Sequence, residues 1–152
     1  MTYLKIIGYY DSDNKEHWLG KIKECEWSAG QFLHKCLKEG TFKEAIGESS
    51  DVLMLTEGDK LISFCTLAEK DDIQPTELTP WIGFVYTFPQ YRGHRYSGKL
   101  LSYAEERARE KGFDRVYIST NHTGLYEGFG YELYAFMKDM DGDESRVYIK
   151  KV

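Results

Sequence analysis

Apolar residues along the chain fall into short strand-like runs and longer segments with helical spacing. Three dense runs, at 52–57, 61–69 and 81–88, are rich in aliphatic and aromatic residues and are predicted as strands. Gly58 and Asp59 separate the first two and tolerate the positive φ of a hairpin turn. The third run is dense in aromatic and β-branched residues, which is typical of a buried central strand.

Three segments are predicted as helices: 16–24, Ser28 to Gly40, and 97–111. Ser28 is expected to cap the second helix and Gly40 to end it. The third is the clearest, because Gly112 follows it and its apolar residues share one face: Leu100, Leu101, Ala104 and Ala108.

Shorter elements complete the pattern. A first strand is expected over 3–10, a short turn at 41–46, a strand at 115–119, a short helix at 123–128, and a hairpin formed by 131–140 and 144–150. The chain has no repeat and no linker-like stretch. This order predicts one domain over residues 1–152, of the α/β (α+β) class.

Composition narrows the kinds of partner. A formal net charge of −5 argues against a nucleic-acid-binding face. The apolar runs fall short of the roughly 20 residues that a membrane helix needs, and the first eight residues lack the features of a signal peptide. The three cysteines are odd in number and lie among apolar residues, which favours reduced thiols and a cytoplasmic location.

The connection between the third strand and the helix over 97–111 has the composition of an anion site. Pro89 ends the strand, and two glycines then let the backbone approach a ligand closely. The helix start contributes about half a positive charge, and Arg92 and Arg95 add donors suited to phosphate oxygens. A solvated loop that only caps the helix has the same pattern, so the loop alone does not decide.

Two motifs in this region resemble those of the GCN5-related N-acetyltransferase (GNAT) family. The family's cofactor loop reads Gln/Arg-x-x-Gly-x-Gly/Ala. Arg92 takes the first place here, and Arg95 and Ser97 stand where the Gly and the final Gly/Ala are usual. A later segment with Tyr126 is similar to the family's Leu-Tyr-x-x-x-Gly-Phe, with Tyr131 in place of Phe. The resemblance implies a mixed, mostly antiparallel sheet of about six to seven strands with flanking helices, splayed between strands 4 and 5.

The resemblance also implies where acetyl-coenzyme A (acetyl-CoA) would bind. Its pantetheine arm would lie between the splayed strands, and Asn121 would either bond its amides or simply end the fifth strand. The implied cofactor-binding residues on the fourth strand are Phe84, Val85, Tyr86 and Thr87. Those on the loop are Arg92, Gly93, His94, Arg95, Tyr96, Ser97 and Gly98.

Acetyl transfer to an amine needs a base for the amine and an acid for the departing thiolate. The resemblance gives the acid role to Tyr126, whose pKa we expect the dipole of a short helix to lower. His122 is the first candidate for the base because of its ordinary pKa of about 6.5. The other candidates are Glu69, Asp71, Asp72 and Glu77, and no spacing selects among them. The histidines and cysteines show no metal-ligand spacing, so no metal is expected.

Other functions stay open on the sequence alone. The departures at Arg95 and Ser97 also fit a non-catalytic acyl-CoA sensor, whereas the lack of a Walker or Rossmann pattern disfavours other nucleotide-binding domains. For an enzyme, we expect a primary amine of a small molecule or peptide as acceptor. The family resemblance adds a homodimer as an expectation. Three tryptophans could line an acceptor pocket or pack in the core: Trp18, Trp27 and Trp81.

Overall fold

The computed structural model describes residues 3–152, and the first two residues of the N-terminal segment lie outside the described residues. Its centre is a seven-stranded sheet in the order β1-β2-β3-β4-β5-β7-β6. The strands are β1 (Leu4–Gly8), β2 (Asp51–Glu57), β3 (Lys60–Ala68), β4 (Trp81–Thr87), β5 (Arg115–Thr120), β6 (Glu132–Lys138) and β7 (Glu144–Lys151). Only β4 and β5 pair in parallel, which confirms the mixed, mostly antiparallel sheet.

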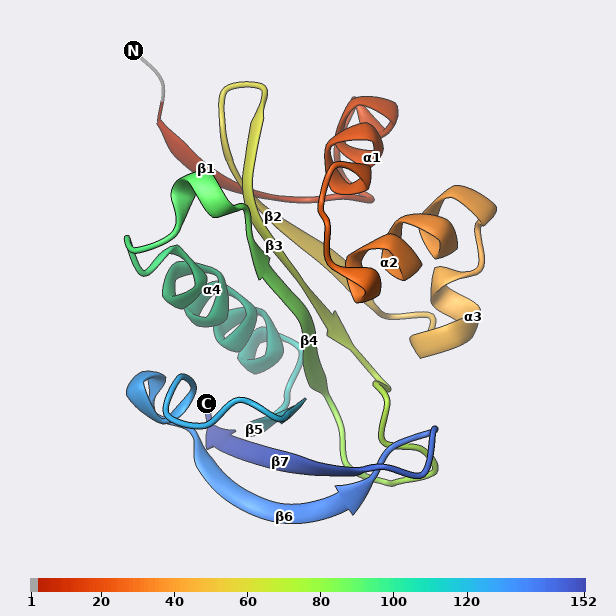
Figure 1. Cartoon of the computed structure of the whole chain (residues 1–152), viewed down its shortest axis with the longest axis vertical. Coiled ribbons are helices and arrows are strands. Elements are labelled where there is room, and N and C mark those ends of the chain that lie inside the picture. The colour runs from red at the N-terminus through yellow and green to blue at the C-terminus, as the bar shows by residue number, and fades with distance from the viewer. Residues whose placement is uncertain (1–2) are drawn as a thin grey trace.

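Helices cover both faces of this sheet. They are α1 (Lys15–Lys23), α2 (Ser28–Glu39), α3 (Phe42–Ile46) and α4 (Tyr96–Glu110), with 3-10 turns η1 (Pro89–Tyr91) and η2 (Glu127–Phe129). Figure 1 shows α4 on one side of the sheet and α1, α2 and α3 on the other.

Strand alternation divides the core between the two faces. In β2, Val52 and Met54 pack with the three N-terminal helices, whereas Leu53 and Leu55 pack with α4. All four side chains are buried. The continuous apolar run of β2 therefore reflects a strand that is covered on both faces.

Most element boundaries lie close to the predicted ones, with three differences at the helices. The short helix predicted over 123–128 is wrong, because this segment forms a turn followed by the 3-10 turn η2. Ser28 is the first residue of α2, and Trp27 holds the cap position without a side-chain hydrogen bond, so the predicted capping role of Ser28 is wrong. The segment expected as a short turn at 41–46 contains the helix α3. No helix within residues 3–152 is long and apolar enough to cross a membrane.

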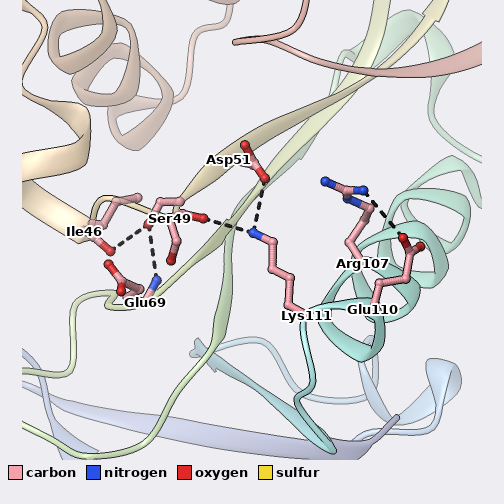
Figure 2. Close-up of polar contacts among 8 residues, drawn as sticks. Ile46, Ser49, Asp51, Glu69, Arg107, Glu110 and Lys111 are labelled. Carbon is pink, nitrogen blue, oxygen red and sulfur yellow. Dashed lines mark hydrogen bonds and ion pairs between the residues drawn. The ribbon is translucent and has the colours of Figure 1, made fainter.

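A polar cluster ties the lower end of α4 and the end of β3 to the segment before β2 (Figure 2). Lys111 Nζ, just after α4, donates to Ser49 O at 3.0 Å and lies 3.4 Å from Asp51 Oδ2. Ser50 Oγ donates to Ile46 O at 2.8 Å and accepts from the backbone N–H that follows β3. These contacts fix the start of the β3–β4 connection.

A buried acidic residue joins α4 to the C-terminal hairpin. Glu105 is 8 % exposed. It accepts hydrogen bonds from Tyr131 OH at 2.8 Å and from Lys150 Nζ at 2.9 Å. Lys150 Nζ also donates to Phe129 O at 2.8 Å. Tyrosine in place of the family's phenylalanine is thus matched by an acceptor on the facing helix.

We expect Tyr131→Phe to lower the free energy of unfolding by about 1–2 kcal/mol, because a buried carboxylate loses one donor but keeps its lysine. Urea unfolding at neutral pH measures this change. Tyr134→Phe is the matched control, since Tyr134 is half-exposed. Equal stability of the two variants would contradict a stabilising role for the Tyr131–Glu105 bond.

Candidate active site

The loop between β4 and α4 presents a row of backbone N–H groups with no partner. Arg92 is extended, Gly93 has φ 88° and Arg95 has φ 57°, and α4 then begins at Tyr96. Within residues 3–152, the N–H groups from Gly93 to Ser97 make no hydrogen bond. Unpaired donors at a helix start attract anions.

Arg95 occupies the cap position of α4, and Ser97 lies inside the first turn of the helix. Arg95 is left-handed there, which costs a non-glycine residue about 1 kcal/mol or more. Its guanidinium carbon lies 4.9 Å from the centroid of the Phe129 ring, and this cation–π contact offsets part of the cost.

Gly98 is required by packing as well as by its place in the loop. A Cβ on Gly98 would lie 2.6 Å from Phe129 Cε1, closer than carbon atoms can approach. Helix α4 therefore rests directly on η2. Helix α4 and the segment that carries Tyr126 are held against each other through this contact.

Arg92 is tied to the end of β4. Its Nε donates to Thr87 O at 2.9 Å, and its guanidinium lies 5.5 Å from the Tyr86 ring centroid. The remaining guanidinium nitrogens make no hydrogen bond within the described chain. The ring of His94 lies 5.3 Å from that of Tyr96 at the helix start. The structure thus brings the predicted loop residues together beside β4.

Strand β4 leaves β5 after a single residue pair, Trp81 with Tyr117. On its other side, the register with β3 shifts between Phe64 and Thr66. Phe84 has φ 50° at this bulge. Beyond the first pair, the β4 edge facing β5 carries no strand partner among the described residues, so it is open to an extended ligand.

Tyr126 lies under α4 and precedes η2, and it is 5 % exposed. Burial raises its pKa to about 12, and the nearby Cys65 and Asp71 add to the rise. The expectation that a helix dipole lowers this pKa is wrong, because η2 has only three residues and desolvation opposes the phenolate.

His122 and Asn121 are exposed in the turn after β5. The backbone N–H of His122 donates to Thr120 Oγ1 at 3.1 Å, and its carbonyl accepts from Tyr148 OH at 3.4 Å. Both contacts use only the main chain of His122, so they shape the turn and do not engage its imidazole.

Asp71 is the candidate base with the most distinctive environment. A Cβ on Gly83 would collide with Asp71 Oδ1 and would lie 3.3 Å from Thr66 Oγ1. The carboxyl therefore rests on the β4 backbone next to the bulge. Burial, followed by the charge of Asp72, raises the pKa of Asp71 to about 7.

An aromatic surface covers the same strand from the side of α2. The Trp27 ring is parallel to the Tyr86 ring at 5.8 Å and lies edge-on to Phe84 at 6.3 Å. Trp27 is 37 % exposed, whereas Trp18 and Trp81 are buried. Of the three tryptophans, only Trp27 is placed to meet an incoming molecule.

A hollow of about 420 Å³ lies beside the β3–β4 connection rather than over the splay. Its lining residues are Lys70, Ile73, Gln74, Pro75, Thr76 and Met140. It contains none of the predicted site residues, so the site is defined by the open β4 edge and the loop. Within residues 3–152, no cluster of His, Cys, Asp and Glu could hold a metal ion.

A sheet splayed at its parallel pair, with an unpaired N–H loop at the following helix, defines the fold of the acetyltransferases. The chain matches the family model of the acetyltransferase (GNAT) family over residues 15–131 and belongs to this family. The protein is accordingly an acyltransferase. A comparison with curated proteins gave no match.

Solved structures share the whole fold at low sequence identity. A protein assigned to the GNAT acetyltransferases from Desulfovibrio desulfuricans superposes with a TM-score of 0.70 at 13% identity, covering 98% of this chain and 99% of that one. The Escherichia coli GNAT enzyme YhbS in complex with CoA gives 0.69 at 17%, covering 99% and 81%. An aminoglycoside 6'-N-acetyltransferase complexed with coenzyme A gives 0.65 at 12%, covering 98% and 96%.

Proposed function

We propose that the protein is an acetyl-CoA-dependent N-acetyltransferase that moves an acetyl group to a primary amine of a small molecule or peptide by direct attack. The observation that carries this proposal is the unpaired N–H row from Gly93 to Ser97 beside the open edge of β4. The first suits a pyrophosphate and the second suits the amide-bearing pantetheine arm.

The phosphates bind the loop from Arg92 to Gly98, and pantetheine pairs with main chain from Phe84 to Thr87. The bulge at Phe84 supports this assignment, because it interrupts the pairing of β4 with β3, and a main-chain N–H left unpaired at a bulge can polarise a thioester carbonyl. Asn121 stands at the end of β5, where its amide can meet the pantetheine amides. Similar structures described with CoA are consistent with this cofactor.

Tyr126 acts as the acid that meets the departing thiolate. It lies in the core beneath α4, in the same cluster as Cys65 of β3, and Cys65 contributes to its raised pKa. Tyr126 therefore faces the sheet next to the splay. His122, in the turn before Tyr126, stays a candidate for the base. No metal is needed, because the thioester is already activated and protein side chains can carry out both proton transfers, from the amine and to the departing thiolate.

The acceptor approaches a surface with acidic and aromatic groups, which suits an amine in its cationic form. A relative of similar fold is described as an aminoglycoside 6'-N-acetyltransferase, and small polyamines and aminoglycosides are sensible first acceptors to try.

The free, buried thiols Cys25, Cys36 and Cys65 support a location in the reducing cytoplasm. The protein is also proposed to form a homodimer, because members of this family often pair.

The proposal is tested by incubating the protein with acetyl-CoA and a panel of amines while free thiol is measured. We expect amine-dependent release of CoA and an acetylated product that is 42 Da heavier by mass spectrometry, roughly the mass of an acetyl group replacing hydrogen. Binding of acetyl-CoA with no release over a broad panel would favour the sensor instead.

Arg95→Asn is expected to weaken acetyl-CoA binding about fivefold to tenfold, because Asn tolerates the left-handed conformation but removes the charge beside the phosphates. The loss should shrink as salt is raised. Arg107→Gln is the matched control, since Arg107 pairs with Glu110 near the far end of α4 (Figure 2). Equal affinities of the two variants, measured by calorimetry, would remove Arg95 from the site.

A further inference from the structure

The proposed function needs a group that takes the proton from the acceptor amine, and the two faces of the sheet restrict where it can lie. In β3, Phe64 and Ala68 pack with the N-terminal helices, whereas Cys65 and Leu67 pack with α4. Thr66 lies between the latter two, so alternation points its side chain toward the N-terminal helices.

Asp71 lies on that same face. Gly83 pairs with Thr66 across the strands, and a Cβ on Gly83 would meet both Thr66 Oγ1 and Asp71 Oδ1. Tyr126 packs on the opposite face with α4. Tyr126 and the Asp71 carboxylate therefore lie on opposite faces of the sheet, as expected if the thiol leaves on one side and the amine arrives on the other.

Thr66 gives a second, independent indication of a binding position. Its side chain is fully buried. Among residues 3–152, its Oγ1 is the one buried side-chain polar atom without a hydrogen-bond partner. Buried hydroxyl groups nearly always have a partner, because leaving one unpaired costs about 1–3 kcal/mol. An amine N–H supplied by a ligand would satisfy it.

The main chain around Asp71 is held firmly. Lys70 N donates to Ile46 O at 3.0 Å, and Ile46 O also accepts from Ser50 Oγ, as drawn in Figure 2. Asp71 O accepts from Gln74 Nε2 at 2.8 Å, and Asp72 O accepts from Met140 N at 2.9 Å. The backbone that carries the Asp71 carboxyl is thus held by α3, by its own loop and by the β6–β7 turn.

We propose that Asp71 is the general base of the reaction, and that the acceptor amine enters on the α1–α2 face, between Asp71 and Thr66 Oγ1. This inference rests on the proposed acetyl transfer. The partly exposed Trp27 packs against Phe84 and Tyr86 on the same face of β4, where its ring can attract the incoming ammonium group.

Each proton in the step has a destination. The Asp71 carboxylate takes one proton from the ammonium group, and the neutral nitrogen attacks the thioester carbonyl carbon. The C–S bond then breaks, Tyr126 gives its proton to the thiolate sulfur, and the nitrogen's extra proton restores the tyrosine. Asp71 finally releases its proton to solvent. The products are the N-acetylated amine, CoA and one proton.

The two groups assist each other through their charges. The Asp71 carboxylate is one of the causes of the raised pKa of Tyr126. Once Asp71 has taken the amine proton it is neutral, and this contribution disappears. Tyr126 therefore becomes a stronger acid in the part of the cycle in which the thiolate leaves. A base with a pKa of about 7 is also well matched to neutral conditions.

The test compares Asp71→Asn with wild type in kcat/KM from pH 5.5 to about 10, using the best acceptor from the amine panel. We expect kcat/KM to fall about 10²–10³-fold at pH 7. The rising limb of the curve of kcat/KM against pH should move from near pH 7 toward the acceptor's own pKa. Acetyl-CoA affinity, measured by calorimetry, should stay within about twofold. Thr66→Val should raise the acceptor KM severalfold with acetyl-CoA affinity unchanged.

Asp72→Asn is the matched control, because it removes the neighbouring charge that raises the pKa of Asp71. It should keep full activity at pH 8 and move the rising limb to lower pH. An Asp71→Asn enzyme that keeps the rate and the limb of wild type would overturn the assignment. If instead wild type neither binds acetyl-CoA nor releases thiol, the proposed function itself fails, and the two failures are distinguishable.

Discussion

Tyr126→Phe is expected to lower kcat by about 10²-fold while acetyl-CoA affinity changes little. The hydroxyl is the only part that is removed, and the ring keeps its packing against Tyr131 and Tyr148. The thiolate would then leave without a proton donor in a buried site, where an unneutralised charge is costly. Initial rates of thiol release at saturating acetyl-CoA and acceptor measure the effect.

Tyr103→Phe provides the comparison, because Tyr103 packs against the same core cluster from α4 and has no assigned role. We expect it to keep the wild-type kcat. A Tyr126→Phe enzyme with full turnover would show that water or the acceptor supplies the proton, and Tyr126 would then be a packing residue.

Asp71→Asn is expected to stabilise the folded protein at pH 8 by about 2–4 kcal/mol while it impairs catalysis. The folded pKa of about 7 lies above the ordinary value of 3.8, so the folded state holds the extra proton between these values. The wild-type protein therefore loses stability as pH rises from about 4 through 7, because folding then holds a carboxylate in an unfavourable place. Below about pH 4 this cost is absent. Asparagine is neutral at every pH, so the variant does not have this cost.

Urea unfolding at pH 4 and pH 8 checks this prediction. The two proteins should have nearly equal stability at pH 4, and the variant should be the more stable at pH 8. A variant that is less stable than wild type at both values would mean that the carboxylate is favourably bound in the fold. Gain of stability with loss of activity is typical of groups retained for function.

The sequence predicts the framework well because the main elements have strong local patterns. The run over β2 and the face of α4 with Leu100 and Ala104 are predicted from the periodicity of apolar residues. Helix starts are less predictable. Trp27 and Arg95 occupy cap positions for which other residue types are usual, because contacts with Tyr86 and Phe129 compensate for the missing caps.

The candidate site is only partly predictable from sequence. Motif spacing predicts the loop and Tyr126 as candidate site residues. It does not select Asp71, because the decisive contact is with Gly83 in the next strand, and spacing along the chain does not show such contacts. A helix dipole was the expected influence on Tyr126, yet burial outweighs it. The one usable signal for Glu105 was a charged residue on the apolar face of α4, four residues after Leu101.

Titration of the wild-type protein with acetyl-CoA in a calorimeter is the most direct measurement of the central claim. Saturable binding is predicted, with one site per chain, an affinity in the range of about 1 µM to 1 mM, and weakening as salt is added. A folded protein that gives no binding signal up to millimolar acetyl-CoA would contradict the account.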